Sequence, residues 1–484
     1  MIKLSASLEK LLRDARIDLV LSRIEKDESV LNEVIKHIDS DIRSIKFNSI
    51  LVLGEVGKKS ADAVSKIISC LEDDDWSICR EATRSLGKIG DVAKKAVSHL
   101  YGLLGDNEES IRKEAAIALG KIGNPTLESI SSLIKALDDG SEIVRTEVAK
   151  ALGEIGSDAY EAIPYLMKSL KDISWTVRTA SAESISLIGK ESTNAIPSLI
   201  SALADPDWRV RYRVVSTLVE IGEAAIPSIL EILTHKNKIV RKEAIDALGE
   251  MKIADPKIIH AISKLLTDKT EMVRGKTADT LRNIGKAAVP NLLRGLEEAN
   301  NKMKVIIISA LSGIGSDAKD AIPTLISILE FIEEINSDEI EIKKNLLYSK
   351  SILQRIKLMF STLNEYFSAV VKSEAARALG SIGKDSENAI SALEYALINP
   401  KFIIRREAAL SLGKLGSSAV VALPSLIEAL EDRNPDVRWR ASEALGIIGV
   451  NTENVISSLN GLVHDKCDYV CEAALTALDD LAED

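Results

Sequence analysis

Apolar residues recur along the chain in a pattern of two helices that repeats at a nearly constant interval. Residues 162–170, AIPYLMKSL, place apolar side chains at helical spacing, and residues 142–156, EIVRTEVAKALGEIG, place them along one helical stripe. Each copy therefore predicts a short first helix followed by a longer second helix.

The motif that ends the second helix occurs 13 times. Of the twelve spacings between successive copies, nine equal 33, two equal 30 and one equals 68, which identifies a repeat array. A closing Gly, as at Gly156, suits the left-handed residue that ends a helix. Pro near the start of the first helix, as at Pro164, is tolerated because no N–H is needed there. The copies begin at Leu53, Leu86, Leu119, Leu152, Ile185, Leu218, Leu248, Leu281, Leu311, Leu379, Leu412, Leu445 and Leu478.

The pattern VRxxAAxALGxIG, seen as IRKEAAIALGKIG from Ile111 with an AIPxLIxAL stretch before it, resembles the HEAT-like repeats of the phycobilisome-lyase type. The resemblance spans roughly residues 28–484. It implies an all-α, right-handed α-α superhelix, or solenoid, of about 13–14 two-helix repeats. It also implies that one face of the second helices lines a concave surface.

Four segments follow from this register. Residues 1–27 are expected to form an N-terminal helical cap, residues 28–330 to form repeats, and residues 367–484 to form repeats and a C-terminal cap. Residues 331–366, at the longest spacing, are expected to form either a degenerate repeat with extended helices or an inserted helical hairpin.

A basic residue lies seven positions before the motif residue in 11 of 13 copies, and eight copies place an Asp six positions earlier again. Repetition at every copy is typical of a structural ladder, because a catalytic pair needs to occur only once. The Asp is expected to cap the second helix and lie near a neighbouring Arg. Cys79 and Cys471 interrupt the ladder. Its arginines are Arg112, Arg145, Arg178, Arg211, Arg241, Arg274, Arg405 and Arg438.

Composition and net charge limit the expected binding partners and the expected compartment of the protein. The net charge of −11 argues against a general nucleic-acid coat. Four cysteines form no disulfide framework, no apolar run approaches the length of a membrane span, and the N-terminus lacks the apolar core of a signal peptide, so a cytoplasmic protein is expected.

The stretch DWRVRYR, residues 207–213, interleaves arginines with aromatics. A helical wheel assigns Trp208 to the border of the packed face and therefore favours a packing role. It directs Arg209, Tyr212 and Arg213 to the concave side, where exposed aromatics are common interface anchors. Trp439 and Arg440 hold the same positions as Tyr212 and Arg213 and are further candidate partner-binding residues.

No zincin, P-loop, dinucleotide-binding or nucleophile-elbow motif is present, so no catalytic residue and no cofactor is expected. His464, Cys467 and Cys471 lie close together but lack a fourth ligand, so no metal site is expected.

The leading hypothesis is a non-enzymatic scaffold that binds a protein or peptide on its concave face. Two alternatives stay open. The repeat resemblance suggests an enzyme or enzyme subunit of bilin-lyase type, and the basic-aromatic stretch at 208–213 suggests nucleic-acid binding. Mixed charge signs at the same helical positions of other repeats make nucleic acid the less favoured partner.

Overall fold

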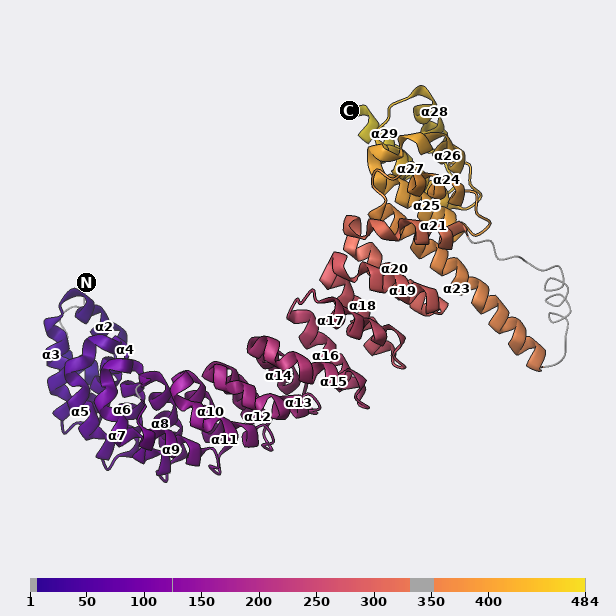
Figure 1. Cartoon of the computed structure of the whole chain (residues 1–484). Coiled ribbons are helices and arrows are strands. Elements are labelled where there is room, and N and C mark those ends of the chain that lie inside the picture. The colour runs from indigo at the N-terminus through magenta and orange to yellow at the C-terminus, as the bar shows by residue number, and fades with distance from the viewer. Residues whose placement is uncertain (1–6, 124, 331–351, 484) are drawn as a thin grey trace. The chain divides into compact units, whose positions relative to one another are not determined.

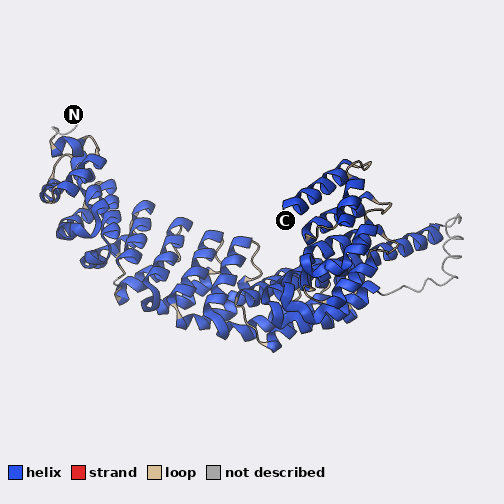
Figure 2. Cartoon of the chain, turned by 90° about the horizontal axis from the view of Figure 1, so that it is seen from above, coloured by secondary structure: helices blue, strands red, loops and turns tan. Residues whose placement is uncertain are grey.

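The computed structural model describes residues 7–123, 125–330 and 352–483, and these residues form helices joined by turns, with no strand among them (Figure 2). The all-α fold class is thereby confirmed. Thirteen helix pairs occur in the described residues, one for each copy of the sequence motif.

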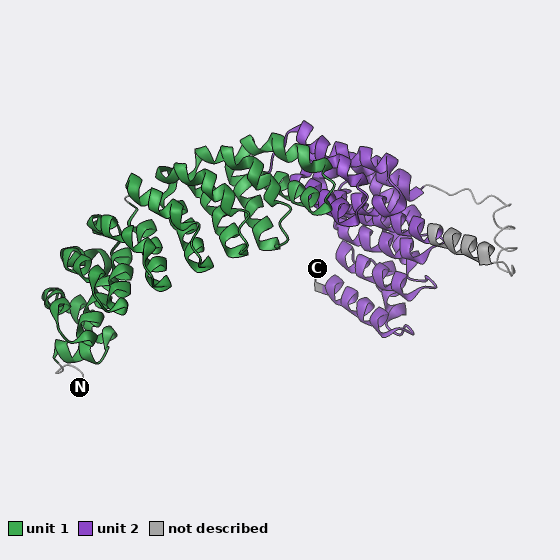
Figure 3. Ribbon diagram, turned by 90° about the horizontal axis from the view of Figure 1, so that it is seen from below, with its two compact units in different colours: residues 1–251 green, residues 252–484 purple. Residues whose placement is uncertain are grey.

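The chain divides into two compact units, residues 1–251 and 252–484 (Figure 3). The division falls at the one motif copy in which a lysine replaces the closing glycine. Lys252 has a positive φ, in the left-handed region that favours glycine.

Unit 1 begins with two short helices, α1 and α2, and continues with seven helix pairs, of which α15 and α16 are the last. In Figure 1 the second helices of this unit lie along the inner side of its curve and the first helices lie along the outer side. The helices of unit 1 are α1 (Leu8–Arg13), α2 (Ile17–Lys26), α3 (Ser29–Lys36), α4 (Arg43–Val56), α5 (Val64–Ser69), α6 (Trp76–Ile89), α7 (Val97–Leu100), α8 (Glu109–Ile122), α9 (Leu127–Ala136), α10 (Glu142–Ile155), α11 (Ile163–Ser169), α12 (Trp175–Ile188), α13 (Ile196–Ala202), α14 (Trp208–Ile221), α15 (Ile226–Glu231) and α16 (Lys238–Glu250).

Unit 2 contains six helix pairs among its described residues. Its helices are α17 (Pro256–Ser263), α18 (Glu271–Ile284), α19 (Val289–Glu298), α20 (Asn301–Ile314), α21 (Ile322–Glu330), α23 (Ile352–Ile382), α24 (Glu387–Ala396), α25 (Phe402–Leu415), α26 (Leu423–Ala429), α27 (Pro435–Ile448), α28 (Glu453–Leu462) and α29 (Asp468–Glu483).

Helix α23 replaces the regular second helix of its repeat. It packs against α21 and has 31 residues, whereas the neighbouring second helix α25 has 14. The longest spacing between motif copies, 68 residues, therefore arises inside a single helix pair, because the additional residues follow α21 and extend the start of α23. The boundary expected at residue 366 falls inside α23. The rest of the segment expected to form a degenerate repeat or an inserted helical hairpin, residues 331–351, lies outside the described residues.

Neighbouring second helices approach closely because the motif places glycine at their contact. A Cβ added to Gly87 of α6 would lie 2.9 Å from the Cα of Ala118 in α8, closer than side chains tolerate. The same relation holds between Gly413 and Ala444 in unit 2, also at 2.9 Å. The first glycine of LGxIG is therefore a packing residue.

The closing glycines adopt a different conformation from the one predicted. Gly156, for example, combines a positive φ with a strongly negative ψ, a combination that is essentially restricted to glycine. This conformation leads directly into the 3₁₀ turn Gly156–Ala162 and then into α11. The left-handed cap expected from sequence occurs at Gly123 and Gly449, where a loop and a side-chain-capped first helix follow instead.

One stretch, Phe402–Ala429, is long and apolar enough by composition to cross a membrane. In the structure it is not a single helix, because the 3₁₀ turn Gly416–Ala422 separates α25 from α26. Leu412 and Leu426 of these two helices are fully buried in the protein. Such a stretch is what the apolar core of a repeat array produces.

Candidate functional site

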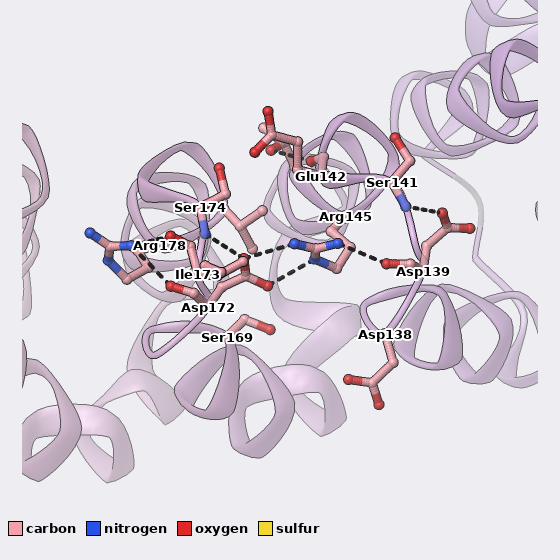
Figure 4. A network of polar contacts seen from close by, with 12 residues as sticks. Asp138, Asp139, Ser141, Glu142, Arg145, Ser169, Asp172, Ile173, Ser174 and Arg178 are labelled. Atoms are coloured by element: carbon pink, nitrogen blue, oxygen red, sulfur yellow. Dashed lines mark hydrogen bonds and ion pairs between the residues drawn. The ribbon is translucent and has the colours of Figure 1, made fainter.

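The arginines of the sequence ladder connect successive repeats (Figure 4). The Arg145 Nε and Nη2 atoms donate to the Asp172 carboxylate of the next repeat at 2.8 and 2.9 Å, and Nη1 donates to the Asp139 carbonyl oxygen at 2.8 Å. The side chains of Arg145 and Asp172 are only 12% and 13% exposed. The Arg145 guanidinium therefore connects the turns before two successive second helices, and its ion pair with Asp172 is bidentate.

The same bidentate geometry recurs along both units. Arg112 donates to Asp139, Arg178 to Asp205, Arg405 to Asp432 and Arg438 to Asp465, in every case across 27 residues. Arg241 and Arg274 donate to the carbonyl oxygens of His235 and Asp268. The ladder arginines are thus engaged in contacts that hold the array together.

The ladder aspartates do not cap the second helices, which corrects the expectation from sequence. The Asp139 carboxylate accepts the backbone amide of Ser141 at 2.8 Å, and the Ser141 hydroxyl then accepts the amide of Ile143 at 3.2 Å. The cap residue therefore lies two positions after the aspartate. The aspartate forms an Asx turn that orients its carboxylate toward the arginine of the preceding repeat.

Substitutions in the ladder change its partners. His235 replaces the aspartate of one repeat, and Arg211 instead pairs with Glu243 at 3.0 Å. Cys79 and Cys471 replace arginines, and their thiols donate to the carbonyl oxygens of Leu71 and Asp465 at 3.1 and 3.2 Å.

Burial and the ladder contacts act in opposite directions on the aspartates. Burial alone would raise the pKa of Asp172, but the hydrogen bonds from Arg145 and from the Ser174 amide outweigh burial. The pKa of Asp172 therefore lies below its ordinary value. The Asp172 carboxylate raises the pKa of Arg145 in turn. Both groups are ionised near neutral pH.

The arginines of the stretch at 207–213 all have carboxylate partners. Arg209 pairs with Asp207 at 2.7 Å, Arg211 with Glu243, and Arg213 with Glu183 at 3.7 Å. The Arg209 guanidinium also lies 3.5 Å from the ring centre of Trp175 in the preceding repeat, a cation–π contact. Arg209 and Arg213, two of the candidate partner-binding residues, therefore already have carboxylate partners within the protein.

The two aromatics of the same stretch are open to solvent. Tyr212 is 60% exposed, as its helical position predicted. Trp208 is 65% exposed, so its predicted packing role is wrong. Trp208 is the first residue of α14, and the wheel angle that placed it beside the packed face does not account for the open end of the helix.

Sequence reasoning missed an exposed aliphatic side chain in the preceding repeat. Ile173, in the loop before α12, is 93% exposed, and Trp175 at the start of α12 is 37% exposed. Other repeats place Asp74, Asn107 or Gly140 at the loop position of Ile173, and this contrast was the available signal. We call Ile173, Trp175, Trp208, Arg209 and Tyr212 the unit 1 patch.

Trp439 and Arg440, the second pair of candidates, are more enclosed. The Trp439 ring meets the Tyr469 ring edge-on, with centres 5.6 Å apart, and the Tyr469 hydroxyl donates to Asp436 at 3.0 Å. Arg440 lies over the Trp439 ring at 3.7 Å and pairs with Glu443 at 2.6 Å. These residues form a local cluster on α27 and α29.

The sequence profile of the HEAT repeats matches residues 31–120, 97–186, 174–235, 196–282, 226–312 and 421–479, which together cover more than half of the chain. The chain belongs to the HEAT repeat family. A profile of the PBS lyase HEAT-like repeat also matches residues 404–432, and the resemblance inferred from the sequence motif is confirmed. No curated protein matches this HEAT repeat chain.

Solved structures of other helical repeat proteins are similar in fold. A structure of Kap95p with RanGDP has a TM-score of 0.45 at 13% identity, covering 94% of this chain and 78% of that one. The CpcE–CpcF complex of phycocyanin lyase from Nostoc sp. PCC7120 has a TM-score of 0.32 at 23% identity, covering 52% of this chain and 94% of that one. A designed armadillo repeat protein has a TM-score of 0.33 at 21% identity, covering 40% and 99%.

A shallow pocket recurs beside the ladder of the HEAT repeats. One copy, of about 420 Å³, lies next to Arg178 and Asp205 in unit 1. Another, of about 440 Å³, lies next to Arg405 and Asp432 in unit 2, at the equivalent repeat positions. A feature that follows the repeat in this way arises from the packing of adjacent first helices.

The Glu81 carboxylate on α6 is buried, and its only ion pair among the described residues is a long one, 3.9 Å from its Oε2 atom to Arg84. The Glu81 side chain is 2% exposed, and its Oε1 atom has no hydrogen-bond partner among the described residues. Burial raises the pKa of Glu81, and the nearby Arg84 lowers it only in part. Glu147, at the same position two repeats later, pairs with Lys150 at 2.8 Å.

No group of three or more His, Cys, Asp and Glu side chains able to hold a metal ion occurs in the part of the chain that the structure describes. His464, Cys467 and Cys471 therefore form no such group. The four cysteines have free thiols.

Proposed function

We propose that this HEAT repeat protein is a non-enzymatic scaffold that binds a protein or peptide partner through the unit 1 patch. The observation that carries the proposal is the exposure of Ile173, Trp208 and Tyr212, at 93%, 65% and 60%, on adjacent repeats. Large apolar side chains gathered on a surface are typical of a protein interface, and Trp and Tyr dominate the binding energy of such interfaces.

The patch is ordered in a way that suits an anchor. Trp208 and Tyr212 lie one helical turn apart on α14, so their side chains share one side of the helix. Arg209 stacks on Trp175 and pairs with Asp207, which ties α12 and α14 together at the patch. The Trp175 ring, held by this contact, loses less conformational entropy when a partner arrives.

The charges of the patch support a protein partner over a nucleic acid. Phosphate recognition relies on cations that release counterions, and the three arginines of this stretch each have a carboxylate partner. The interaction offered to a partner is therefore mainly apolar and aromatic. The proposal places the protein in a reducing compartment, the cytoplasm, which the free thiols suit.

Photo-cross-linking from the patch tests this proposal. A benzoylphenylalanine is placed at Tyr212 of the intact chain, and at Tyr165 in a matched control. Tyr165 lies on a first helix, α11, and is 49% exposed. Irradiation in an extract of the source cells is expected to yield a discrete cross-linked protein from position 212 that is absent from position 165.

The Trp208→Ala substitution should reduce that cross-link several-fold without changing the thermal unfolding of the chain, because the side chain is solvent-exposed in the free protein. The same products from both positions, or a cross-link that survives the substitution unchanged, would rule out the patch as the binding surface.

A further inference from the structure

A larger pocket in unit 2 lies where the repeat pattern is broken. Its volume is about 560 Å³, and Tyr366 and Ala369 of α23 line one side while Phe402 at the start of α25 lines the other. Tyr366 is 61% exposed and Phe402 is 39% exposed. Phe402 is the first residue of α25, whereas Tyr366 and Ala369 lie inside the longer helix α23. The pocket borders the ladder pocket beside Arg405, with which it shares Pro400 and Arg433.

The register of the repeats explains why the pocket exists. In the other repeats, the residue thirteen positions before the motif is usually the ladder aspartate, in a loop that orients its carboxylate. Here that position is Tyr366, and the chain runs through it as a continuous helix. Ala369 occupies the position of Trp175 and Trp208 in unit 1, so the wall of the pocket has a small side chain where those repeats have a Trp.

The same changes alter the charge of the pocket. Tyr366 and Asn399 replace two successive ladder aspartates, so two carboxylates are missing from this part of the ladder. Lys401, Arg433 and Glu365 line the pocket, so its charged lining residues carry a net charge of +1. No carboxylate of the described residues forms an ion pair with Lys401 or Arg433. Arg433 donates a long hydrogen bond to the Pro400 carbonyl oxygen at 3.4 Å. The pocket thus combines an apolar wall with two cations and one carboxylate, and its lining is positive on balance.

We propose that this unit 2 pocket binds an acidic peptide segment that inserts one large apolar side chain. The apolar side chain would lie between Tyr366 and Phe402, and flanking carboxylates would pair with Lys401 and Arg433. An apolar anchor supplies affinity through burial, and complementary charge selects the sequence around it. The site is separate from the unit 1 patch, and its existence does not depend on the function proposed for that patch.

The test uses the full chain and a capped peptide, Glu-Glu-Bpa-Glu-Glu, in which Bpa is the photoreactive benzoylphenylalanine. After irradiation, peptide mapping is expected to locate the label within residues 365–369 or 400–403. The double substitution Lys401→Glu and Arg433→Glu should reduce labelling at least about fivefold, since both attractions become repulsions. Phe402→Ala should also reduce it.

Matched controls separate this site from its neighbours. Lys269→Glu changes the loop position equivalent to Arg433 in another repeat, does not alter the lining of this pocket, and should leave labelling unchanged. Tyr212→Ala should also leave it unchanged, because it affects only the unit 1 patch. Circular dichroism of each variant checks that the helices are retained.

Three outcomes would overturn the proposal. A Gln-Gln-Bpa-Gln-Gln peptide that labels the pocket equally well would show that charge does not select the occupant. Labelling spread outside residues 365–369 and 400–403 would show that the peptide does not bind there. Labelling that falls as the protein concentration rises would indicate that a second copy of the chain occupies the pocket.

Discussion

At the residue scale, the repeat assigns similar residues to different tasks according to their register. Arg145 and Arg209 both pair with an aspartate, yet Arg145 joins two repeats from a position only 12% exposed, whereas Arg209 is 43% exposed and pairs within its own helix cap. Burial strengthens the Arg145–Asp172 ion pair. It also makes loss of one partner more destabilising, because the other charge would remain buried without a counter-ion.

Arg145→Ala should therefore reduce the free energy of unfolding by about 3 kcal/mol at pH 7, since Asp172 keeps its charge and loses its partner. Lys168→Ala is the control, because its ion pair with Asp138 is exposed on both sides and should contribute little. Urea unfolding measures both. A loss from Arg145→Ala no larger than that from Lys168→Ala would contradict a structural ladder.

The ladder contribution should also depend on pH. The pKa of Asp172 is lower in the folded chain, so its contribution is complete above the ordinary aspartate pKa of about 4 and is lost as the pH falls through the lowered value. The difference in stability between the wild-type protein and Arg145→Ala should therefore shrink in acid. Equal differences at pH 7 and in strong acid would be inconsistent with an ion pair.

For Glu81 we expect the opposite effect of ionisation on the free energy of unfolding. Its pKa is raised by burial, so its charge destabilises the folded chain at neutral pH. Glu81→Gln should raise the free energy of unfolding by about 1 kcal/mol at pH 7, and the gain should vanish below the ordinary glutamate pKa of about 4.3. Glu147→Gln, which removes a paired carboxylate, should give no gain. A loss of stability for Glu81→Gln at pH 7 would refute this account.

How far sequence predicted the site also depends on the residue. Arg145 could be placed because its position recurs, and the exposure of Tyr212 follows from helical geometry. The exposure of Trp208 and Ile173 could not be read in the same way. Both lie at the end of a helix or in a loop, where helical periodicity no longer determines which side chains are covered.

At the element scale, close contact between second helices depends on glycine. Gly87→Ala should cost about 1–3 kcal/mol of stability, because the new Cβ would lie 2.9 Å from the Ala118 Cα and the helices must separate. Gly275→Ala, inside α18, meets no atom within 4 Å and should gain up to about 1 kcal/mol through helix propensity. Thermal unfolding should therefore move in opposite directions, and a gain from Gly87→Ala would exclude tight packing there.

Element boundaries were predictable where the motif is regular and failed where it is not. The 14-residue helix α14 follows the pattern of its neighbours. The 31-residue helix α23 does not, because its repeat lacks the loop in which the ladder aspartate normally lies. The closing glycines were placed correctly, but the sequence could not distinguish a left-handed cap from the turn that leads into a 3₁₀ helix.

At the scale of the whole molecule, thirteen copies of one motif made the solenoid fold predictable, because each helix pair buries its apolar side only against its neighbours. The same regularity conceals function, since structural residues recur in every copy. Function is therefore sought where copies differ, as they do at Ile173 and Tyr366.

The affinity of a purified partner for variants of the unit 1 patch tests most directly whether this patch is the binding surface. The protein cross-linked from position 212 is titrated with the intact chain, with the double variant Trp208→Ala and Tyr212→Ala, and with Tyr165→Ala. If the patch binds the partner, we expect Kd to rise at least about tenfold for the double variant and to stay unchanged for Tyr165→Ala, because interface aromatics supply much of the binding energy. Equal Kd values for the intact chain and the double variant would contradict it.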